Sequence, residues 1–211
     1  MKDRVHEWVG RLLCGAMRLV SGTADRWVDC DPSTRQRVYY GNHTSHFDFV
    51  ILWSALPLEV RRLVRPAAAR DYWEISPLRR YLAHRVFNAI LIDRVDHGGT
   101  LSDAAHSLNA TVEGMGERHS LIIFPEGTRG TGEALAPFKS GIFHIARRKP
   151  GVEFVPVYME NLSRILPKGE LLPVPLISSI SLGKPLTLEA NEGKVAFLAR
   201  ARQAILDLAN P

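Results

Sequence analysis

A histidine and an aspartate with four residues between them, His43 and Asp48, are the first residues whose types and spacing suggest chemistry. They follow a short β-like run, residues 36–40, and precede an apolar segment that begins at Phe49. This pattern is typical of a strand that ends in a loop before a helix, and open α/β sheets bind ligands at such strand ends. If the loop brings the two side chains together, the aspartate holds one ring nitrogen of His43 and the other accepts a proton. The spacing therefore predicts a general base.

The same stretch also has a purely structural interpretation. Ser45 and Asp48 stand three residues apart before an apolar run, which is the pattern of a capping box at a helix start. Ser45 would then be the N-cap, Asp48 would complete the cap, and His43 would be an ordinary loop residue. Since acid–histidine pairs also form for structural reasons, this stretch alone leaves both interpretations open.

The composition is that of a folded protein with an excess of positive charge. The chain has 211 residues, 45% of them hydrophobic and 23% charged, so we expect a single domain over residues 1–211. The net charge of +5 is carried mainly by arginine, which suits bidentate binding of phosphate or carboxylate. An anionic partner is expected: nucleic acid, a membrane surface, an acidic carrier protein or a phosphorylated substrate. Because no nucleic-acid-binding motif and no basic stripe with interleaved aromatics occur, we do not expect nucleic acid to bind.

Cysteine usage and apolar runs bear on cofactors and location. Cys14 and Cys30 have no metal-ligand spacing and make no disulfide framework in a chain of this length. Arginines interrupt the only N-terminal apolar run, so no signal peptide is expected, and no run approaches the ~20 apolar residues that span a bilayer. We therefore expect no metal and no bound cofactor, and a cytoplasmic protein, either soluble or peripheral on the inner face of the membrane.

Strand-like and helix-like patterns alternate along the chain and predict an α/β fold, with a mixed, largely parallel sheet flanked by helices. The expected strands are 36–40, 62–69, 88–92, 121–124, 153–159 and 177–182, and the expected helices are 4–20, 48–57, 76–84, 101–115, 138–148 and 192–208. Pro156 lacks a backbone N–H and therefore predicts a bulge or an edge position for its strand.

The N-terminal segment, residues 4–20, has the pattern of a basic amphipathic helix. Its apolar residues recur at helical spacing, and its arginines repeat every seven positions along another face (Val5, Trp8, Val9, Leu12, Ala16 and Leu19; Arg4, Arg11 and Arg18). Such a helix with a tryptophan is typical of an interfacial membrane element. Packing of the apolar face on the domain core would produce the same pattern.

Polar and charged residues gather where the predicted strands end. The first strand is followed by Asn42, His43 and Asp48, the second by Arg70, the third by Arg94, and the fourth by Glu126, Thr128 and Arg129. Strand ends in an α/β sheet can converge on one cleft, and this set suits a substrate with a hydroxyl group and a phosphate. Each charged hydrogen bond from arginine to phosphate contributes ~1.5–3 kcal/mol. Any one of these arginines, taken alone, is equally typical of a solvated surface charge.

These motifs resemble the signature blocks of the glycerolipid acyltransferases, the family of lysophosphatidate acyltransferases. Residues 42–48, Asn-His-Thr-Ser-His-Phe-Asp, resemble the first block, and residues 124–129, Phe-Pro-Glu-Gly-Thr-Arg, match the third block in full. Residues 90–94 resemble the second block, 155–157 the fourth, and 138–141 the segment that follows the third. The blocks occur in the family's order and at similar separations. We therefore expect residues 36–159 to form the catalytic core, with 1–22 as a membrane-interface helix and 192–209 as a closing helix.

The resemblance implies a reaction and a role for each signature residue. A fatty acyl group would pass from an acyl thioester to the free hydroxyl of lysophosphatidate, giving phosphatidate, with His43 as the general base and Asp48 orienting its ring. In the family, the positions of Glu126 and Arg129 are associated with the glycerol portion and the acceptor phosphate. The remaining substrate-binding positions implied by the resemblance are Gly127 and Thr128 of the same block, Arg94, and Arg70, which stands near a phosphate-contacting lysine of many members.

The partners implied by the resemblance are a lysophospholipid acceptor, acyl-CoA or acyl carrier protein as donor substrate, and a membrane surface reached through the N-terminal helix. Two alternatives stay open. The acceptor could be another lysolipid, namely a different lysophospholipid, a lyso-ornithine lipid or a glycolipid, and a phosphomonoester acceptor in particular predicts dependence on Arg129 and Arg94. The chain could also be a non-catalytic lipid-binding module of the same fold, although the intact His43, Asp48 and Glu126 favour an enzyme.

Overall fold

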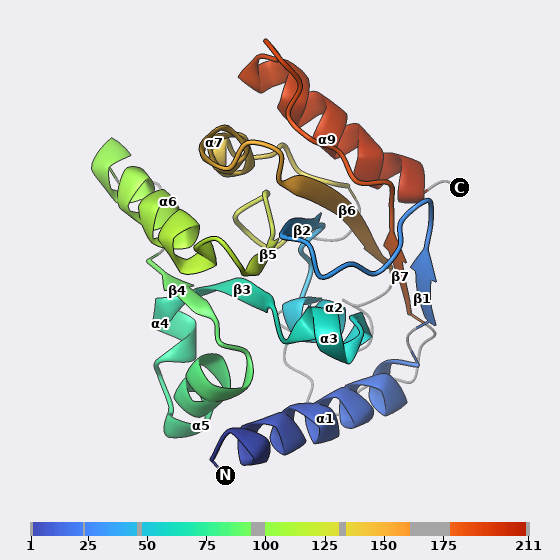
Figure 1. Cartoon of the computed structure of the whole chain (residues 1–211), viewed down its shortest axis with the longest axis vertical. Coiled ribbons are helices and arrows are strands. Elements are labelled where there is room, and N and C mark those ends of the chain that lie inside the picture. Colours follow the sequence, from blue (N-terminus) through green and yellow to red (C-terminus); the bar gives the residue numbers. More distant parts are fainter. Residues whose placement is uncertain are drawn as a thin grey trace.

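A seven-stranded sheet forms the centre of the computed structural model, and helices cover both of its faces (Figure 1). The structure describes residues 2–22, 24–45, 48–93, 100–130, 134–160 and 178–209. The strands are β1 (Ala24–Trp27), β2 (Arg37–Gly41), β3 (Val64–Ala69), β4 (Ile90–Ile92), β5 (Ser120–Ile123), β6 (Glu153–Glu160) and β7 (Ser179–Leu182). They lie in the order β1-β7-β6-β2-β5-β3-β4. Every pair is parallel except β6 and β7, which confirms the mixed, largely parallel sheet.

The helices surround this sheet in two layers. They are α1 (Lys2–Ser21), α2 (Asp48–Ala55), α3 (Leu58–Arg61), α4 (Arg70–Trp73), α5 (Pro77–Tyr81), the π-helix η1 (Leu82–Val86), α6 (Leu101–Met115), α7 (Gly141–Arg148) and α9 (Lys194–Ala209). In Figure 1, α1 and α2 lie on one face, below the sheet, and α7 and α9 lie on the other. Among the described helices, none has an apolar stretch long enough to cross a membrane.

Strand β2 is central and buried at every position, and it divides the apolar core into two. Because successive residues of a strand point to opposite faces, Tyr39 belongs to the core under α1 and α2, with Leu52 of α2. Its neighbours Val38 and Tyr40 belong to the core under α7 and α9, with Phe197 of α9. Core side chains therefore pack on both faces of β2, so the position of the residues that follow this strand is well defined.

Most predicted elements are present, with ends shifted by a few residues. The strand expected from residue 62 begins at Val64, because the turn after α3 occupies the residues before it. The helix expected from residue 138 begins at Gly141, and the strand expected from residue 177 begins at Ser179, with 177 outside the described residues. Strand β1 was not predicted, since its four residues are mostly exposed and polar and form a strand only by pairing with β7.

Pro156 lies in an interior strand, so the edge position is wrong as one of the two predicted alternatives, a bulge or an edge position. Strand β6 pairs with β2 on one side and with β7 on the other. Val157 pairs with Leu182, and Phe154 pairs with Leu186. The segment from Leu182 to Leu186 is therefore one residue longer than the segment of β6 that it faces. The carbonyl of Pro156 accepts the N–H of Gly183 within this irregular stretch. The missing N–H of the proline thus falls where the ladder is already interrupted, which makes an interior position possible.

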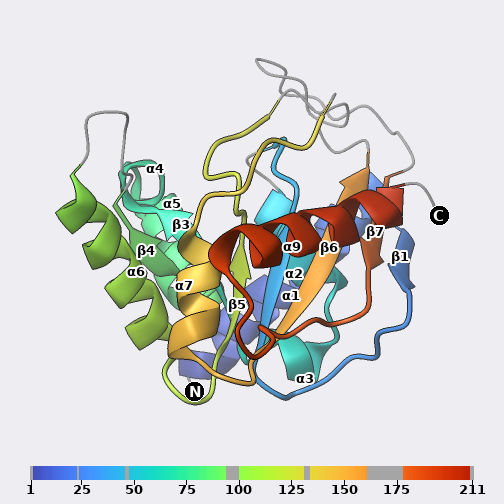
Figure 2. The ribbon, with the colours of Figure 1, turned by 90° about the horizontal axis from the view of Figure 1, so that it is seen from above.

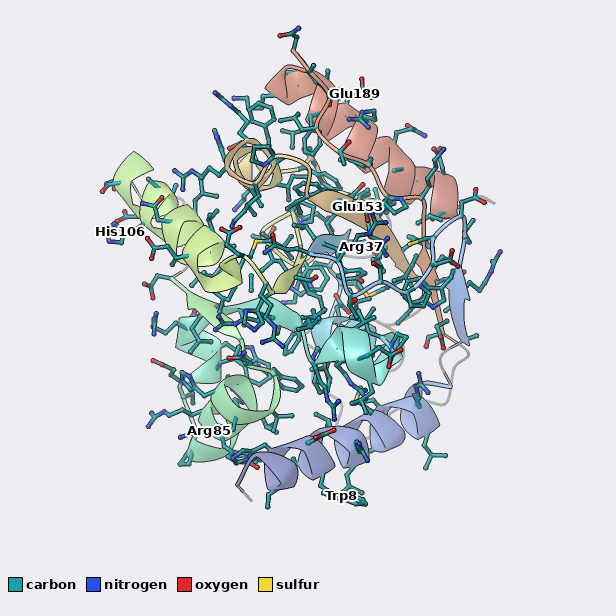
Figure 3. All side chains as sticks on the ribbon, viewed as in Figure 1. Trp8, Arg37, Arg85, His106, Glu153 and Glu189 are labelled. Atoms are coloured by element: carbon teal, nitrogen blue, oxygen red, sulfur yellow. The ribbon has the colours of Figure 1, made fainter. Side chains whose placement is uncertain are left out.

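The apolar stripe of α1 faces away from the rest of the protein, which contradicts the alternative that it packs on the core. Val5, Trp8, Leu12 and Leu19 are 56–86% exposed, and Figure 3 shows Trp8 pointing outward from α1. A different side of the helix, with Gly10 and the buried Cys14, faces the body of the protein. The helix therefore has a small inner face and a large exposed apolar one.

Candidate active site

The loops after β2 and β5 lie together at the carboxyl edge of the sheet, at the top of Figure 2. The two strands are neighbours and parallel, with Tyr40 in register with Ile123. Their following residues, His43 and Glu126, therefore leave the sheet side by side. The sequence prediction that these strand ends converge is confirmed for this pair.

His43 and Asp48 form the hydrogen bond that their spacing predicts. The Nδ1 atom of His43 lies 2.8 Å from Oδ2 of Asp48. The same carboxylate oxygen accepts the backbone N–H groups of Thr44 and Ser45, at 2.6 and 2.8 Å. The bond to the Ser45 N–H is the half of a capping box that Asp48 was expected to supply, so the capping and histidine-binding roles coexist.

The two side chains differ in accessibility. The buried Asp48 is suited to orient the imidazole, and the partly exposed His43 is suited to contact a substrate. Asp48 is fully buried, whereas the side chain of His43 is 22% exposed. No residue of the described chain hydrogen-bonds Nε2 of His43. If Nδ1 carries the proton shared with Asp48, Nε2 has a free lone pair at the surface of the site, as a general base requires.

Glu126 is a second buried carboxylate, and it joins the two loops. Its Oε1 accepts the backbone N–H of His43 at 2.8 Å, and its Oε2 accepts the N–H of Ala136 at 2.9 Å. The backbone also connects the loops directly, since Gly130 donates its N–H to the carbonyl of His43 at 2.8 Å. Glu126 is only 5% exposed. Its observed contacts therefore fix the backbone of the loop that follows β2.

The ring of Phe124 stacks on the imidazole of His43. Their centroids are 4.4 Å apart and their planes differ by 10°. Phe124 is the residue directly after β5, so the sheet fixes one ring and thereby restricts the rotation of the other. Sequence reasoning assigned no role to this residue, although its place at the start of the third signature block was a usable signal.

Asn42 anchors the other side of the loop that follows β2. Its side-chain amide donates to the carbonyl of Met159 at 2.8 Å, and its side-chain oxygen accepts the N–H of the same residue at 2.8 Å. Asn42 is buried, and Met159 belongs to the neighbouring strand β6. With Glu126 on one side and Asn42 on the other, the backbone of His43 is held from both neighbouring strands.

The predicted substrate-binding arginines have different surroundings. Arg129 is exposed and makes no hydrogen bond or ion pair within the described chain, and Gly127 and Thr128 of the same block are also exposed. Arg70 donates to Asp93 at 3.0 Å and to the carbonyl of Leu91 at 3.2 Å, both from the end of β4. Arg94 lies outside the described residues, so its predicted role stays a prediction.

Gly127 has a backbone conformation and a close neighbour that together favour glycine. Its φ angle is +70°, and a Cβ atom there would lie 2.7 Å from the side chain of Lys139. Lys139 in turn donates its backbone N–H to the carbonyl of Pro125. The chain thus closes tightly over the third signature block, and the lysine side chain lies across it. Nowhere in the described chain do three or more metal-ligating side chains cluster.

Residues 30–160 match the family model described as Acyltransferase. The chain belongs to this family. The matched range contains all of the signature blocks and more than half of the chain.

Three of the similar proteins carry the same name. The chain is 40% identical over 132 residues to the 1-acyl-sn-glycerol-3-phosphate acyltransferase of Salmonella typhimurium, covering 60% of this chain and 47% of that protein. It is 30% identical over 173 residues to the enzyme so named from Helicobacter pylori, and this match covers 81% of this chain and 58% of that protein. It is 28% identical over 179 residues to the enzyme so named from Limnanthes douglasii, and this match covers 83% of this chain and 60% of that protein. The chain thus spans about half of the length of these relatives.

The acyltransferase fold itself is shown by a solved structure. The crystal structure of the 1-acyl-sn-glycerophosphate (LPA) acyltransferase PlsC from Thermotoga maritima matches with a TM-score of 0.71. The match covers 98% of this chain and 81% of that chain at 16% sequence identity. The N-terminal helix and the mixed sheet of this chain therefore belong to a known acyltransferase architecture.

Proposed function

We propose that this protein transfers a fatty acyl group from an acyl thioester to the free hydroxyl of lysophosphatidate, forming phosphatidate. The observation that carries the proposal is the 2.8 Å hydrogen bond between His43 and Asp48, which leaves the partly exposed Nε2 of His43 without a partner in the described chain. The names of the relatives support this acceptor, and the family supports acyl transfer.

In the proposed mechanism, Nε2 of His43 removes the proton of the acceptor hydroxyl as its oxygen attacks the thioester carbonyl. The buried Asp48 stabilises the imidazolium that forms, because its carboxylate already binds Nδ1. When the tetrahedral intermediate collapses, the carbon–sulfur bond breaks and the departing thiolate takes the proton from the imidazolium. His43 returns to its neutral form, and no covalent enzyme intermediate is needed.

Glu126 serves this mechanism as a positioning residue in our proposal. The resemblance implied that it binds the glycerol portion, yet both of its carboxylate oxygens already accept backbone N–H groups, from His43 and Ala136. Each oxygen can accept a second bond, so glycerol binding stays a prediction. The contacts present support holding of the catalytic loop, which helps preserve the orientation of His43.

Arg129 is the better supported phosphate-binding residue of the two that the structure describes. It is exposed at the end of the third signature block and has no acidic partner in the described chain. Arg70 already donates to Asp93, so a substrate phosphate would have to compete for it. We therefore assign the acceptor phosphate to Arg129 and a supporting role to Arg70.

Helix α1 is the element that we propose to contact the membrane, on its cytoplasmic face. Its exposed apolar stripe, with Trp8 and Leu12 61% and 69% exposed, is suited to the boundary of headgroups and acyl chains. The exposed Arg11 and Arg18 on the same helix favour an anionic surface, at ~1 kcal/mol for each basic residue. The acyl donor would be acyl-CoA or acyl carrier protein.

The deciding experiment is acyl transfer by the purified protein, with both thioester donors and a panel of lysolipids. We expect turnover of lysophosphatidate, and a fall on the order of 10²–10⁴-fold for His43→Ala. A matched control is His106→Ala, which removes an exposed histidine of α6 (Figure 3) and should leave the rate unchanged. Full turnover by His43→Ala would show that the general base is assigned wrongly.

The acceptor panel separates the proposal from its two alternatives. Activity that is confined to a lysolipid without a phosphomonoester would keep the chemistry and replace the acceptor. In that case Arg129→Gln should have no effect, whereas it should raise the KM for lysophosphatidate if Arg129 binds the phosphate. No turnover of any acceptor with either donor, together with binding of lysolipid, would favour the non-catalytic lipid-binding module.

A further inference from the structure

A cavity of about 330 Å³ lies between the first half of α1, helix α3 and the π-helix η1. Its walls include Glu7 and Arg11 of α1, Arg61 of α3 and Arg85 of η1. In Figure 3, Arg85 lies beside the N-terminal half of α1. No residue of the signature blocks lines it, so the proposed acyl-transfer site does not explain it.

The cavity is at the amino edge of the sheet, opposite the catalytic loops. Val64, the first residue of β3, lines the cavity, whereas Arg70 follows the last residue of that strand. A strand of this length separates its two ends by roughly 20 Å. A ligand in the cavity would therefore be distinct from a substrate at His43.

Positive charge dominates the walls. Four arginines, Arg11, Arg61, Arg62 and Arg85, face one acid, Glu7. Arg11 donates to Glu7 at 3.0 Å, and Arg62 donates to the same carboxylate oxygen. The hydrogen bond from Arg62 lowers the pKa of Glu7, and the nearby charges of Arg62 and Arg11 add to the effect. One negatively charged oxygen, Oε1 of Glu7, is thus already bound between the guanidinium groups of Arg11 and Arg62.

The other two arginines have no acidic partner within the described chain. The guanidinium of Arg61 lies over the ring of Trp53, 4.9 Å from its centroid, and contacts the thiol of Cys14. Burial lowers the pKa of Arg61, and repulsion from Arg18, Arg11 and Arg62 lowers it further. Arg85 is exposed, and no hydrogen bond or ion pair joins its side chain to another described residue. Because Arg61 is partly removed from water without a counter-ion, its charge is unfavourable there, and an anion in the cavity would relieve this cost.

We propose that this cavity binds a phosphate group, carried by the headgroup of an anionic membrane lipid. Guanidinium groups suit phosphate because they can donate two parallel N–H bonds to its oxygens. The lipid source follows from the position of the cavity, since Arg11 also lies over the exposed ring of Trp8, 5.8 Å from its centroid. A lipid whose chains contact the apolar stripe of α1 would place its phosphate beside the same arginine. This site does not depend on acyl transfer.

The first test locates phosphate binding on the full-length protein labelled with ¹⁵N. Inorganic phosphate is titrated while backbone amide shifts are recorded for wild type, Arg85→Gln, Arg129→Gln and Arg147→Gln. We expect shifts in the first half of α1 and in η1 that are lost in Arg85→Gln and kept in the other two. Arg147→Gln is the matched control, because it removes an exposed arginine of α7 on the other face of the sheet. Absence of shifts around the cavity would overturn the proposal.

The second test separates a lipid headgroup from free phosphate. Binding to phosphatidylcholine vesicles is measured with and without phosphatidylglycerol, for wild type, Arg85→Gln, Arg62→Gln and Arg18→Gln. Arg18 is exposed on α1 but does not line the cavity, so its loss should weaken binding by only about 5-fold, as for any basic residue near the surface. We expect at least a ~10-fold loss for each cavity variant, since a charged hydrogen bond to phosphate is removed.

The outcomes have distinct meanings. Equal losses for Arg18→Gln and the two cavity variants would show that charge acts diffusely and would overturn a defined site. Phosphate shifts at the cavity with unchanged vesicle binding would support the anion site and replace its lipid source by a free phosphate ester. Since vesicle binding is read without any acyl transfer, these results are independent of whether the proposed reaction is correct.

Discussion

The two ends of strand β2 both bury charged side chains, yet they use them in different ways. At the amino end, Arg37 is 3% exposed and donates to Glu153 and to the carbonyl of Asp31, each at 2.7 Å. Figure 3 shows Arg37 and Glu153 next to each other in the centre of the molecule. At the carboxyl end, the buried Asp48 and Glu126 receive hydrogen bonds from His43 and from backbone N–H groups.

The difference lies in what remains available for a ligand. Arg37 is surrounded by its own chain's acceptors, so this end of β2 contributes to stability. At the other end, Nε2 of His43 has no partner in the described chain, and neither does the buried Oδ1 of Asp48. Buried polar atoms are normally hydrogen-bonded, so this end of β2 keeps acceptor atoms that the rest of the described chain does not use. The acids there hold His43 in place, and no other described residue binds its second ring nitrogen.

Asp48→Asn should cause the largest change and tests the carboxyl end directly. The amide lacks the negative charge that stabilises the imidazolium, so we expect kcat to fall on the order of 10²–10⁴-fold. The substitution is nearly isosteric, so thermal unfolding should change little by comparison. Steady-state kinetics and a melting curve on the same preparation measure both. A large loss of stability with normal kcat would mean that Asp48 is structural, like Arg37.

Glu126→Gln distinguishes positioning from substrate binding. The amide keeps one acceptor but turns a donor toward one of the two backbone N–H groups, at a cost of about 1–3 kcal/mol. We expect kcat to fall by ~10–100-fold with little change in the KM for the acceptor, because His43 loses its backbone anchor. An increase in KM at constant kcat would instead support the glycerol-binding role that the family resemblance implies.

Glu153→Gln tests the claim that the amino end serves stability alone. Arg37 would remain buried with a neutral partner, and we expect the free energy of unfolding to fall by about 1–3 kcal/mol. For a chain of this size that corresponds to a melting temperature lower by ~2–10 °C. The kcat of the folded protein at low temperature should match wild type. A kcat defect without a change in melting temperature would contradict the division between the two ends.

Phe124→Leu should have the smallest effect. It tests whether the stacked ring of Phe124 helps to orient the imidazole of His43. Stacked aromatic pairs contribute ~0.5–1.5 kcal/mol, so we expect kcat to fall by ~2–10-fold, with the loss recovered in Phe124→Tyr. The leucine fills a similar volume, which keeps the loop in place. If Phe124→Leu matched wild type while His43→Ala was inactive, the hydrogen bond to Asp48 alone would orient the imidazole.

Much of the site could be predicted because its residues are close in sequence or stand directly after strands. His43 and Asp48 are separated by one short loop, and the strand before it and the helix after it have clear apolar patterns, so local structure nearly determines their contact. The third signature block, 124–129, likewise follows a strongly apolar strand. Periodicity also placed most helices and strands within a few residues of their observed ends.

What could not be predicted depends on contacts between distant segments. Glu126 meets the backbone of His43 across 83 positions, and Arg70 finds Asp93 only because β3 and β4 are neighbours. Strand β1 has little apolar character of its own, and Pro156 is tolerated in an interior strand only because the ladder beside it is irregular. Composition and spacing can indicate that strand ends converge, as they did for His43 and Glu126, but they do not specify these individual contacts.

The sequence by itself determined most of the elements, their order and the contact between His43 and Asp48, because periodicity and short spacings act locally. Tertiary structure decided which groups remained free to react or bind. It satisfied Arg37 within the chain and left Nε2 of His43 without a partner among the described residues. It also turned the apolar stripe of α1 outward while gathering arginines behind it. The same residue types thus became structural or functional according to which partners the packed sheet brought within hydrogen-bonding distance.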